Sequence, residues 1–205
     1  MITFVSYQHS SGPMTRITII RHGSTSWNKQ GRMQGSTDIP LDEEGIEQAQ
    51  KLGAKLAAEQ PWDIIYTSHL SRAKRTGEII AEAIGLSPVL TDERLREVSG
   101  GQTEGTVEED RIAKWGPDWR QLDLGMERAD AVFERGVSFM KDLLEEHAGK
   151  KILIVSHGSF IRHMLRHLTP EFELTEQLKN TGVSRLVVDD TKWFCDLYNC
   201  TTHLD

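Results

Sequence analysis

The sequence of 205 residues contains only two cysteines, and no apolar run approaches the roughly 18 residues that a membrane-spanning helix requires. Residues 1–13 lack a basic start followed by a long apolar stretch, so we do not expect a secretory signal. If Cys195 and Cys200 share a strand, they lie roughly 16 Å apart on opposite faces and cannot pair. Reduced, buried thiols in a cytoplasmic protein are therefore expected.

An excess of basic residues is also absent. Lys and Arg together number 24 and Asp and Glu 31, which gives a formal net charge of −7. This balance argues against a nucleic acid or a membrane surface as partner, because both attract a basic field. A small anionic substrate stays compatible, since a few local arginines outweigh the overall charge. The composition, 38% hydrophobic and 27% charged, indicates one globular domain over 1–205.

Two apolar stretches each end on a histidine followed by glycine. They are residues 17–23 (ITIIRHG) and residues 152–158 (ILIVSHG). Continuous apolar runs of this length, each followed by helical patterning, are typical of buried parallel strands. Ligands of open α/β sheets bind beyond the carboxyl ends of such strands. We therefore expect His22 and His157 to lie at one site.

The remaining periodicity predicts an α/β fold, a three-layer αβα sandwich with a mostly parallel central sheet and an antiparallel C-terminal hairpin. We expect helices at 42–59, from about 71 to 84, at 129–147 and after His157, and strands at 62–66, 89–90, 183–188 and 193–198. In the helix at 129–147 the expected apolar positions are Val132, Val137, Met140, Leu143 and Leu144.

Three segments have little regular patterning. Residues 97–105 hold three glycines and predict a loop, and residues 106–128 are polar with scattered tryptophans, which suits short helices or a lid. Residues 1–14 precede the first clear element. They are a flexible extension, an extra strand or a product of start-site choice, and the sequence does not decide among these.

The first histidine motif suits phosphoryl chemistry. An unprotonated imidazole is a nucleophile toward phosphorus, and the ordinary pKa of about 6.5 leaves His22 largely neutral at pH 7. Arg21 offers planar donors that fit phosphate oxygens, and Gly23 leaves room for a substrate to approach the backbone. Taken alone, the motif also fits a histidine that caps a turn beside a surface arginine.

The longer pattern narrows this choice. After RHG come STSWN (24–28), QG (34–35), DIPL (38–41), SHLSRAKRT (68–76), LRE (95–97), GQTEG (101–105), SHG (156–158) and IR (161–162). In this order and spacing the set resembles the histidine phosphatase superfamily, the phosphoglycerate mutase-like proteins, from about Arg16 to Leu204.

The resemblance implies catalytic roles at matching positions. His22 matches the nucleophile that becomes a phosphohistidine, and Glu97 matches the acid that protonates the leaving oxygen and then acts as base. Arg21, Arg72 and His157 match groups that hold the phosphoryl oxygens. Physical reasoning agrees, because arginines and a second imidazole stabilise the equatorial charge of a phosphoryl transition state without a metal.

The same resemblance implies substrate-binding positions. Asn28 matches a polar group of the phosphate pocket, Gln34 and Gly35 match a substrate-side loop, and Gly158 follows the second histidine. We also expect the helix after that histidine to direct its first N–H groups toward the anion. No metal and no cofactor are implied.

The activity that follows is metal-independent hydrolysis of a small phosphomonoester by a cytoplasmic monomer or homodimer. The first alternative is a cofactor-dependent phosphoglycerate mutase, which usually carries a longer, more basic insertion after the Glu97 loop. Here the segment 106–128 is short, and its basic residues are Arg111, Lys114, Arg120 and Arg128. The second alternative is a non-catalytic, phosphate-binding member of the family. Such a protein would be expected to lack His22 or one of the phosphate-holding arginines, Arg21 and Arg72.

Two residue pairs spaced four apart have simpler explanations. His163 and His167 share a helix face and suit zinc, but nothing supplies a third ligand at a recognisable spacing. Trp115 and Trp119 suit a packed helix face better than the wall of a substrate pocket.

Overall fold

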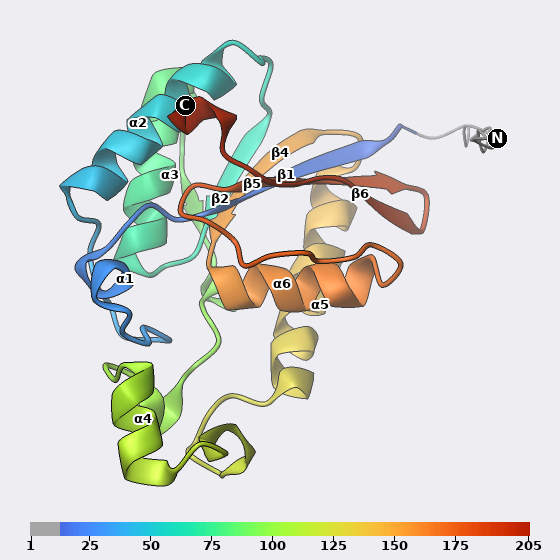
Figure 1. Cartoon of the computed structure of the whole chain (residues 1–205). Coiled ribbons are helices and arrows are strands. Elements are labelled where there is room, and N and C mark those ends of the chain that lie inside the picture. The colour runs from blue at the N-terminus through green and yellow to red at the C-terminus, as the bar shows by residue number, and fades with distance from the viewer. Residues whose placement is uncertain (1–12) are drawn as a thin grey trace, which may run out of the picture.

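In a computed structural model, residues 13–205 are described, and they form a six-stranded sheet in the order β3-β2-β4-β1-β5-β6 (Figure 1). The first four strands in this order run parallel, β5 is antiparallel to β1, and β6 is antiparallel to β5. The strands are β1 (Thr15–Arg21), β2 (Ile64–Thr67), β3 (Leu90–Thr91), β4 (Lys151–Ser156), β5 (Val183–Asp189) and β6 (Lys192–Cys200). The predicted mostly parallel sheet with its antiparallel hairpin is confirmed.

Helices cover both faces of this sheet, α2 and α3 one face and α5 and α6 the other (Figure 1). The helices are α1 (Ser26–Gln30), α2 (Glu43–Ala57), α3 (Ser71–Ile84), α4 (Glu108–Trp115), α5 (Ala129–His147) and α6 (Gly158–Leu168). Short 3-10 turns lie at Glu93–Leu95, Gly101–Thr103, Trp119–Gln121 and Thr202–Leu204. This arrangement is the predicted three-layer sandwich.

The central strand β4 shows why its sequence is apolar at every inner position. Ile152 and Ile154 pack into the core beneath α5 and α6, whereas Leu153 and Val155 pack into the core beneath α2 and α3. All four are essentially buried. A strand covered on both faces needs a continuous apolar run, because alternation would place polar groups in one of the two cores.

The second helix starts as its sequence predicts. Asp42 has an extended backbone and accepts a hydrogen bond from the amide of Gly45, which makes it the N-cap. Glu43 and Glu44 lie in the first turn, where the helix dipole favours negative charge.

Two details of the predicted packing are wrong. Val137 is 37% exposed, because the buried face of α5 is formed by Val132, Gly136, Phe139, Met140 and Leu143, and position 137 lies beside that face. Trp115 and Trp119 do not share a helix. Gly116, whose φ is +88°, and Pro117 end α4, and the chain turns so that Trp119 is buried between the guanidiniums of Arg111 and Arg120.

The cysteines lie on opposite faces of the sheet, as expected for neighbours on one strand. Cys195 packs beside the core under α5 and α6, and Cys200 beside the core under α2 and α3. Neither forms a disulfide. Both are half-buried rather than buried, because β6 is an edge strand and no further strand covers it within the described residues.

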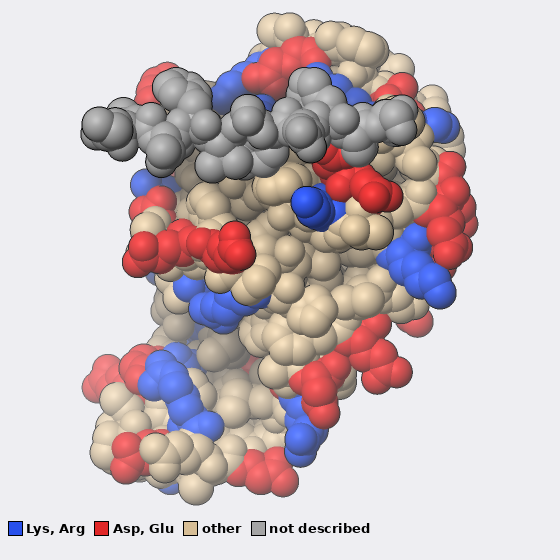
Figure 2. All heavy atoms as spheres, turned by 90° about the vertical axis from the view of Figure 1, so that its right-hand side faces the viewer, with Lys and Arg blue, Asp and Glu red and all other residues tan. Residues whose placement is uncertain are grey.

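The described chain contains no helix long and apolar enough to cross a bilayer. On the face shown in Figure 2, acidic and basic side chains are interspersed, and no extended basic patch is visible. The prediction for residues 1–14 lies outside the described residues except for its last two positions.

Helix α5 offers a matched test of the core boundary. Val132→Ala removes two methyl groups from a fully buried site and is expected to lower the free energy of unfolding by about 2 kcal/mol. Val137→Ala makes the same chemical change at an exposed site and should alter it by less than about 0.5 kcal/mol. Urea denaturation of both variants measures the difference, and equal losses would show that the buried face is wrongly assigned.

Candidate active site

A cavity of about 470 Å³ opens beyond the carboxyl ends of β1, β2 and β4. Its walls come from segments far apart in sequence, because the parallel strands deliver their following loops to the same edge of the sheet. The lining residues are Arg21, His22, Asn28, Arg32, Met33, Gln34, Gly35, Arg72, Glu97, Val98, Ser99, Gly100, Met126, Glu127, Ala129, Ser159 and His163.

The two motif histidines meet beside this cavity, as the sequence predicts: His22 lines it, and His157 lies behind His22 and is not among the lining residues. Both rings are almost completely buried, and their centroids lie 5.1 Å apart. His22 Nδ1 lies 2.7 Å from the carbonyl oxygen of Gly23. Because a carbonyl only accepts, Nδ1 carries the proton and Nε2 keeps a free lone pair. The geometry thus provides an unprotonated ring nitrogen on His22.

The second histidine is anchored by a hydroxyl. His157 Nε2 lies 2.8 Å from the Oγ of Ser68, the first residue after β2. Its other ring nitrogen, Nδ1, is buried and has no partner among the described residues. One edge of the imidazole is therefore fixed to the protein, and the other is buried without a hydrogen-bond partner among the described residues.

Both rings are held in the neutral form. Burial lowers the pKa of His22 well below 6.5, and the nearby charges of Arg21 and Arg72 lower it further. Burial likewise lowers the pKa of His157 well below 6.5, with Arg72 the largest additional cause. A neutral imidazole is the form that a nucleophile toward phosphorus requires.

Two guanidiniums lie beside the histidines, and within residues 13–205 no carboxylate forms an ion pair with either. Arg72 is 1% exposed, and its Nη1 and Nη2 donate to the carbonyls of Thr37 and Gly35 at 2.6 and 2.7 Å. Arg21 donates from Nη1 to the carbonyl of Leu178. The Nε atoms of both arginines are buried and unpartnered among the described residues. Burial lowers the pKa of Arg72 to about 10, although the charge of Glu97 opposes this.

Unpaired buried cations of this kind are costly unless an anion joins them. The two free Nε–H donors of the arginines and the unpartnered ring nitrogen of His157 are polar groups close to His22 that a ligand could satisfy. Planar guanidiniums match the spacing of phosphate oxygens. The inner end of the cavity is therefore built to hold a phosphate-like anion against a neutral imidazole.

Gly23 has a different role from the one predicted. A Cβ at this position would lie 2.6 Å from the carbonyl oxygen of Gly45, so the glycine admits the first turn of α2 rather than a substrate. Its amide donates to Thr76 Oγ1 at 3.1 Å. Thr76 lies one turn after Arg72 on α3, so α3 anchors the loop of the first histidine and also supplies a guanidinium.

Glu97 lies at the cavity and caps helix α6. Its Oε1 accepts hydrogen bonds from the amides of Val98 and Phe160, both at 2.8 Å, and its Oε2 accepts one from Ser159 at 3.1 Å. The prediction that the first N–H groups of α6 point to the anion is therefore wrong for Ser159 and Phe160. The amide N–H groups of these two residues already donate to the carboxylate of Glu97.

The predicted substrate-binding residues are partly brought together. Asn28 and Gln34 line the cavity, and each accepts a hydrogen bond from the hydroxyl of Thr25, at 3.2 and 2.8 Å. Gly35 also lines it, with φ of +53°. Gly158 is not among the lining residues. It lies behind them, where a Cβ would be 3.4 Å from the Nε of Arg21.

Several residues that organise the site were given no role from the sequence, although Glu104 belongs to the GQTEG motif at 101–105. Glu104 accepts hydrogen bonds from the amides of Ser36 and Gly100 and from the hydroxyl of Thr37, so it ties the 35–37 loop to the 99–100 loop. Asn180 donates to the carbonyl of His22 at 3.2 Å. Such partners are many residues apart, and only the fold brings them together.

The second histidine pair has no metal-binding partner in the structure. The ring of Phe133 lies 5.8 Å from that of His163 and 5.0 Å from that of His167. Within residues 13–205, no group of three or more His, Cys, Asp or Glu side chains is arranged to hold a metal ion. His163 instead lines the outer part of the cavity, which the sequence did not indicate.

Comparison with known proteins gives consistent matches over most of the chain. The family model of the histidine phosphatase superfamily (branch 1) matches residues 17–201. The uncharacterized phosphatase PhoE of Bacillus subtilis is 36% identical over 194 residues, which cover 93% of this chain and 97% of that protein. The probable phosphoglycerate mutase GpmB of Yersinia pestis is 34% identical over 209 residues, covering 94% and 96%.

A solved structure agrees with the sequence matches. Bacillus stearothermophilus YhfR superposes with a TM-score of 0.83 at 29% identity, and the match covers 93% of this chain and all of that one. The shared fold thus extends over the whole sheet and both helical layers.

The buried histidines give stability a defined pH dependence. Because their pKa values are lowered in the folded state, the unfolded chain binds protons near pH 6.5 that the folded chain cannot bind. The free energy of unfolding should therefore fall as the pH decreases from about 7 to 5, by up to about 1.4 kcal/mol per pH unit for each histidine. Above about pH 7.5 these groups should have no effect, since both states are neutral.

Urea unfolding at a series of pH values measures this slope. The double variant His22→Gln/His157→Gln should give a shallower slope over the same range, because glutamine does not titrate. Parallel curves for wild type and variant would contradict the assignment.

Proposed function

We propose that this chain, which belongs to the histidine phosphatase superfamily (branch 1), is a metal-independent phosphomonoester hydrolase that works through a phosphohistidine on His22. The observation that carries the proposal is the pair of buried, carboxylate-free arginines beside a neutral imidazole. A phosphoryl group supplies the negative charge that these arginines lack, and the free Nε2 of His22 supplies the nucleophile.

In the first step, the lone pair of His22 Nε2 attacks phosphorus in line with the leaving oxygen. The bond between phosphorus and that oxygen breaks, and a proton from Glu97 neutralises the departing alkoxide. Oε2 of Glu97 is the oxygen suited to carry the proton, because it accepts one hydrogen bond whereas Oε1 accepts two. Arg21 and Arg72 stabilise the charge that spreads over the equatorial oxygens.

In the second step, water attacks the phosphohistidine and Glu97 takes its proton. The bond between nitrogen and phosphorus breaks, its electron pair returns to Nε2, and inorganic phosphate leaves. Nδ1 of His22 keeps its hydrogen bond to the Gly23 carbonyl in this scheme, so the positive charge of the phosphorylated ring is partly balanced by an oxygen.

The surroundings of Arg21 and Arg72, together called the anion clamp, favour transfer of the phosphoryl group to water over transfer to a sugar acid. A mutase must hold the carboxylate of its substrate as well as the phosphoryl group. The basic residues of 106–128 do not line the cavity: Arg111 and Arg120 pair with Glu108, Arg128 pairs with Asp130, and Lys114 lies over the ring of Trp115. Besides Arg21 and Arg72, the cavity lining contains Arg32, whose guanidinium already donates to Gln30 and to the carbonyl of Gly105. Relatives of similar identity are named a phosphatase and a probable mutase, so names alone do not separate the two.

The non-catalytic alternative is disfavoured by the completeness of the site. A protein that only binds phosphate needs the arginines but gains nothing from a neutral imidazole with a free Nε2, or from a carboxylate at the mouth of the clamp. His22 and Glu97 both line the cavity.

Phosphate release from p-nitrophenyl phosphate in EDTA tests the proposal. Wild type should hydrolyse the ester, and His22→Ala should lose at least about a thousand-fold in rate, because the nucleophile is removed. His167→Ala is the matched control, since this histidine is exposed and outside the cavity lining. It should retain wild-type activity.

A second assay follows 3-phosphoglycerate with and without 2,3-bisphosphoglycerate. Isomerisation that depends on the bisphosphate, without net hydrolysis, would establish the mutase instead. Inactivity of wild type toward both substrates, and toward a panel of alkyl phosphates, would overturn the hydrolase and favour a binding role.

A further inference from the structure

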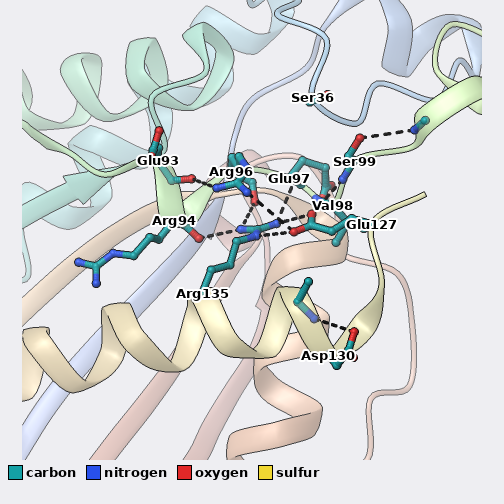
Figure 3. Close-up of polar contacts among 12 residues, drawn as sticks. Ser36, Glu93, Arg94, Arg96, Glu97, Val98, Ser99, Glu127, Asp130 and Arg135 are labelled. Carbon is teal, nitrogen blue, oxygen red and sulfur yellow. Dashed lines mark hydrogen bonds and ion pairs between the residues drawn. The ribbon is translucent and has the colours of Figure 1, made fainter. Parts of the chain in front are cut away.

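Arg135 makes more hydrogen bonds than any arginine of the anion clamp. It projects from the middle of α5 and uses all five guanidinium N–H donors (Figure 3). Nη1 donates to the carbonyls of Arg94 and Arg96 at 2.7 and 2.8 Å, and Nη2 donates to the carbonyl of Glu97 at 3.3 Å. Three of its five bonds therefore hold the backbone that carries Glu97.

That backbone is held by side chains and by other loops rather than by a strand. Residues 96–100 lie between two short 3-10 turns and pair with no strand. Leu95 is fixed from the other side, since Ser156 Oγ donates to its carbonyl at 2.6 Å. Arg135 thus supplies the main side-chain anchor for the two residues that follow.

The remaining two hydrogen bonds of Arg135 go to a carboxylate that lines the cavity. Nε and Nη2 form a two-point ion pair with Glu127, at 2.8 and 3.0 Å. Glu127 lines the cavity and exchanges hydrogen bonds with Ser99, its amide donating to the Ser99 carbonyl and its carboxylate accepting from the Ser99 amide. Two lining residues from different segments, Glu97 and Glu127, are therefore both hydrogen-bonded to one guanidinium (Figure 3).

Arg135 also contacts the helix that orients the Glu97 carboxylate. Its guanidinium lies 4.8 Å from the centroid of the Phe160 ring. The amide of Phe160 donates to Glu97 Oε1. The backbone of Glu97 and the helix end that binds its carboxylate are consequently fixed relative to one another through the same side chain.

We propose that Arg135 is a positioning residue for the acid and base Glu97, with Glu127 as its charge partner, an inference that rests on the hydrolase function proposed above. Arg135 does not line the cavity, so it acts through Glu97 rather than on the substrate. Its effect should be confined to the two proton transfers of Glu97, to the leaving oxygen and from water, because the histidines and the anion clamp are anchored by other residues. The value of kcat/KM covers the chain of events up to departure of the alcohol, so it reports the first of these transfers.

Only a planar, five-donor group can make these bonds together. Lysine keeps the positive charge and can still pair with Glu127, but it has a single nitrogen and cannot reach three carbonyls and a carboxylate at once. Arg135→Lys therefore separates geometry from charge. It also avoids leaving Glu127 as an uncompensated half-buried charge, which would threaten folding.

Leaving-group dependence distinguishes positioning of an acid from a general structural role. An alkyl phosphate needs a proton on its departing oxygen, whereas p-nitrophenolate leaves without one. Arg135→Lys should lower kcat/KM about 10-fold or more for an alkyl phosphate and less than about 3-fold for p-nitrophenyl phosphate. Arg128→Lys is the matched control, because Arg128 is exposed and pairs only with Asp130. It should change neither value.

A double-mutant cycle completes the test. If Arg135 acts through Glu97, adding Arg135→Lys to Glu97→Gln should cause little further loss on the alkyl phosphate. Equal losses on both substrates, or full additivity with Glu97→Gln, would overturn the proposal and make Arg135 a structural ion pair. Thermal unfolding of each variant identifies losses caused by misfolding.

Failure of the hydrolase function itself gives a different result. In that case wild type would release no phosphate from either ester, and His22→Ala would match it. Activity that requires His22 but shows no leaving-group dependence in Arg135→Lys would contradict the positioning role alone.

Discussion

Burial of two guanidiniums beside two uncharged imidazoles is the constraint on which the rest of this structure depends. Among the described residues, neither Arg21 nor Arg72 is paired with a carboxylate, so their donors are satisfied in part by backbone carbonyls and in part left open. The 35–37 loop and the chain before β5 must therefore fold over the site to bring those carbonyls into place. The charge that remains uncompensated is what gives the cavity its preference for an anion.

Around this constraint, each element of the sandwich has a second task. His22, Ser68 and His157 are the first residues after β1, β2 and β4, which brings two imidazoles and the hydroxyl that anchors one of them to the same edge of the sheet. Helix α3 supplies Arg72, and Thr76 one turn later fixes the loop of His22. The parallel order of the strands is thus the reason that residues distant in sequence meet at one edge.

Much of this was predictable from the sequence, and the exceptions share a physical cause. Apolar runs that are buried on both faces identified β1 and β4, and helical periodicity located α3 and α5, because these signals are local. The histidine pair followed from strand topology. The roles of Gly23 and of the α6 amides were predicted incorrectly, since they depend on Gly45 and Glu97, contacts made only in the folded chain. Arg135 and Asn180 were missed for the same reason, and Glu104 was noted in a motif without the loop contacts that it makes. Val137 was wrongly predicted as buried, because one helix position separates a core face from solvent.

The carboxylate of Glu97 caps helix α6 and is also the group proposed to transfer the proton. His157 is the N-cap of α6, and the carboxylate of Glu97 accepts hydrogen bonds from the amides of the first turn. The same helix end therefore holds both the second histidine and Glu97. Each time the acid carries a proton, the helix loses part of the negative charge that its first turn favours. In the proposed reaction, the carboxylate oxygens of Glu97 would therefore serve both proton transfer and the stability of the first turn of α6. A substitution at position 97 that changes the protonation of the side chain would also change the capping of α6. Few residues could therefore replace glutamate here.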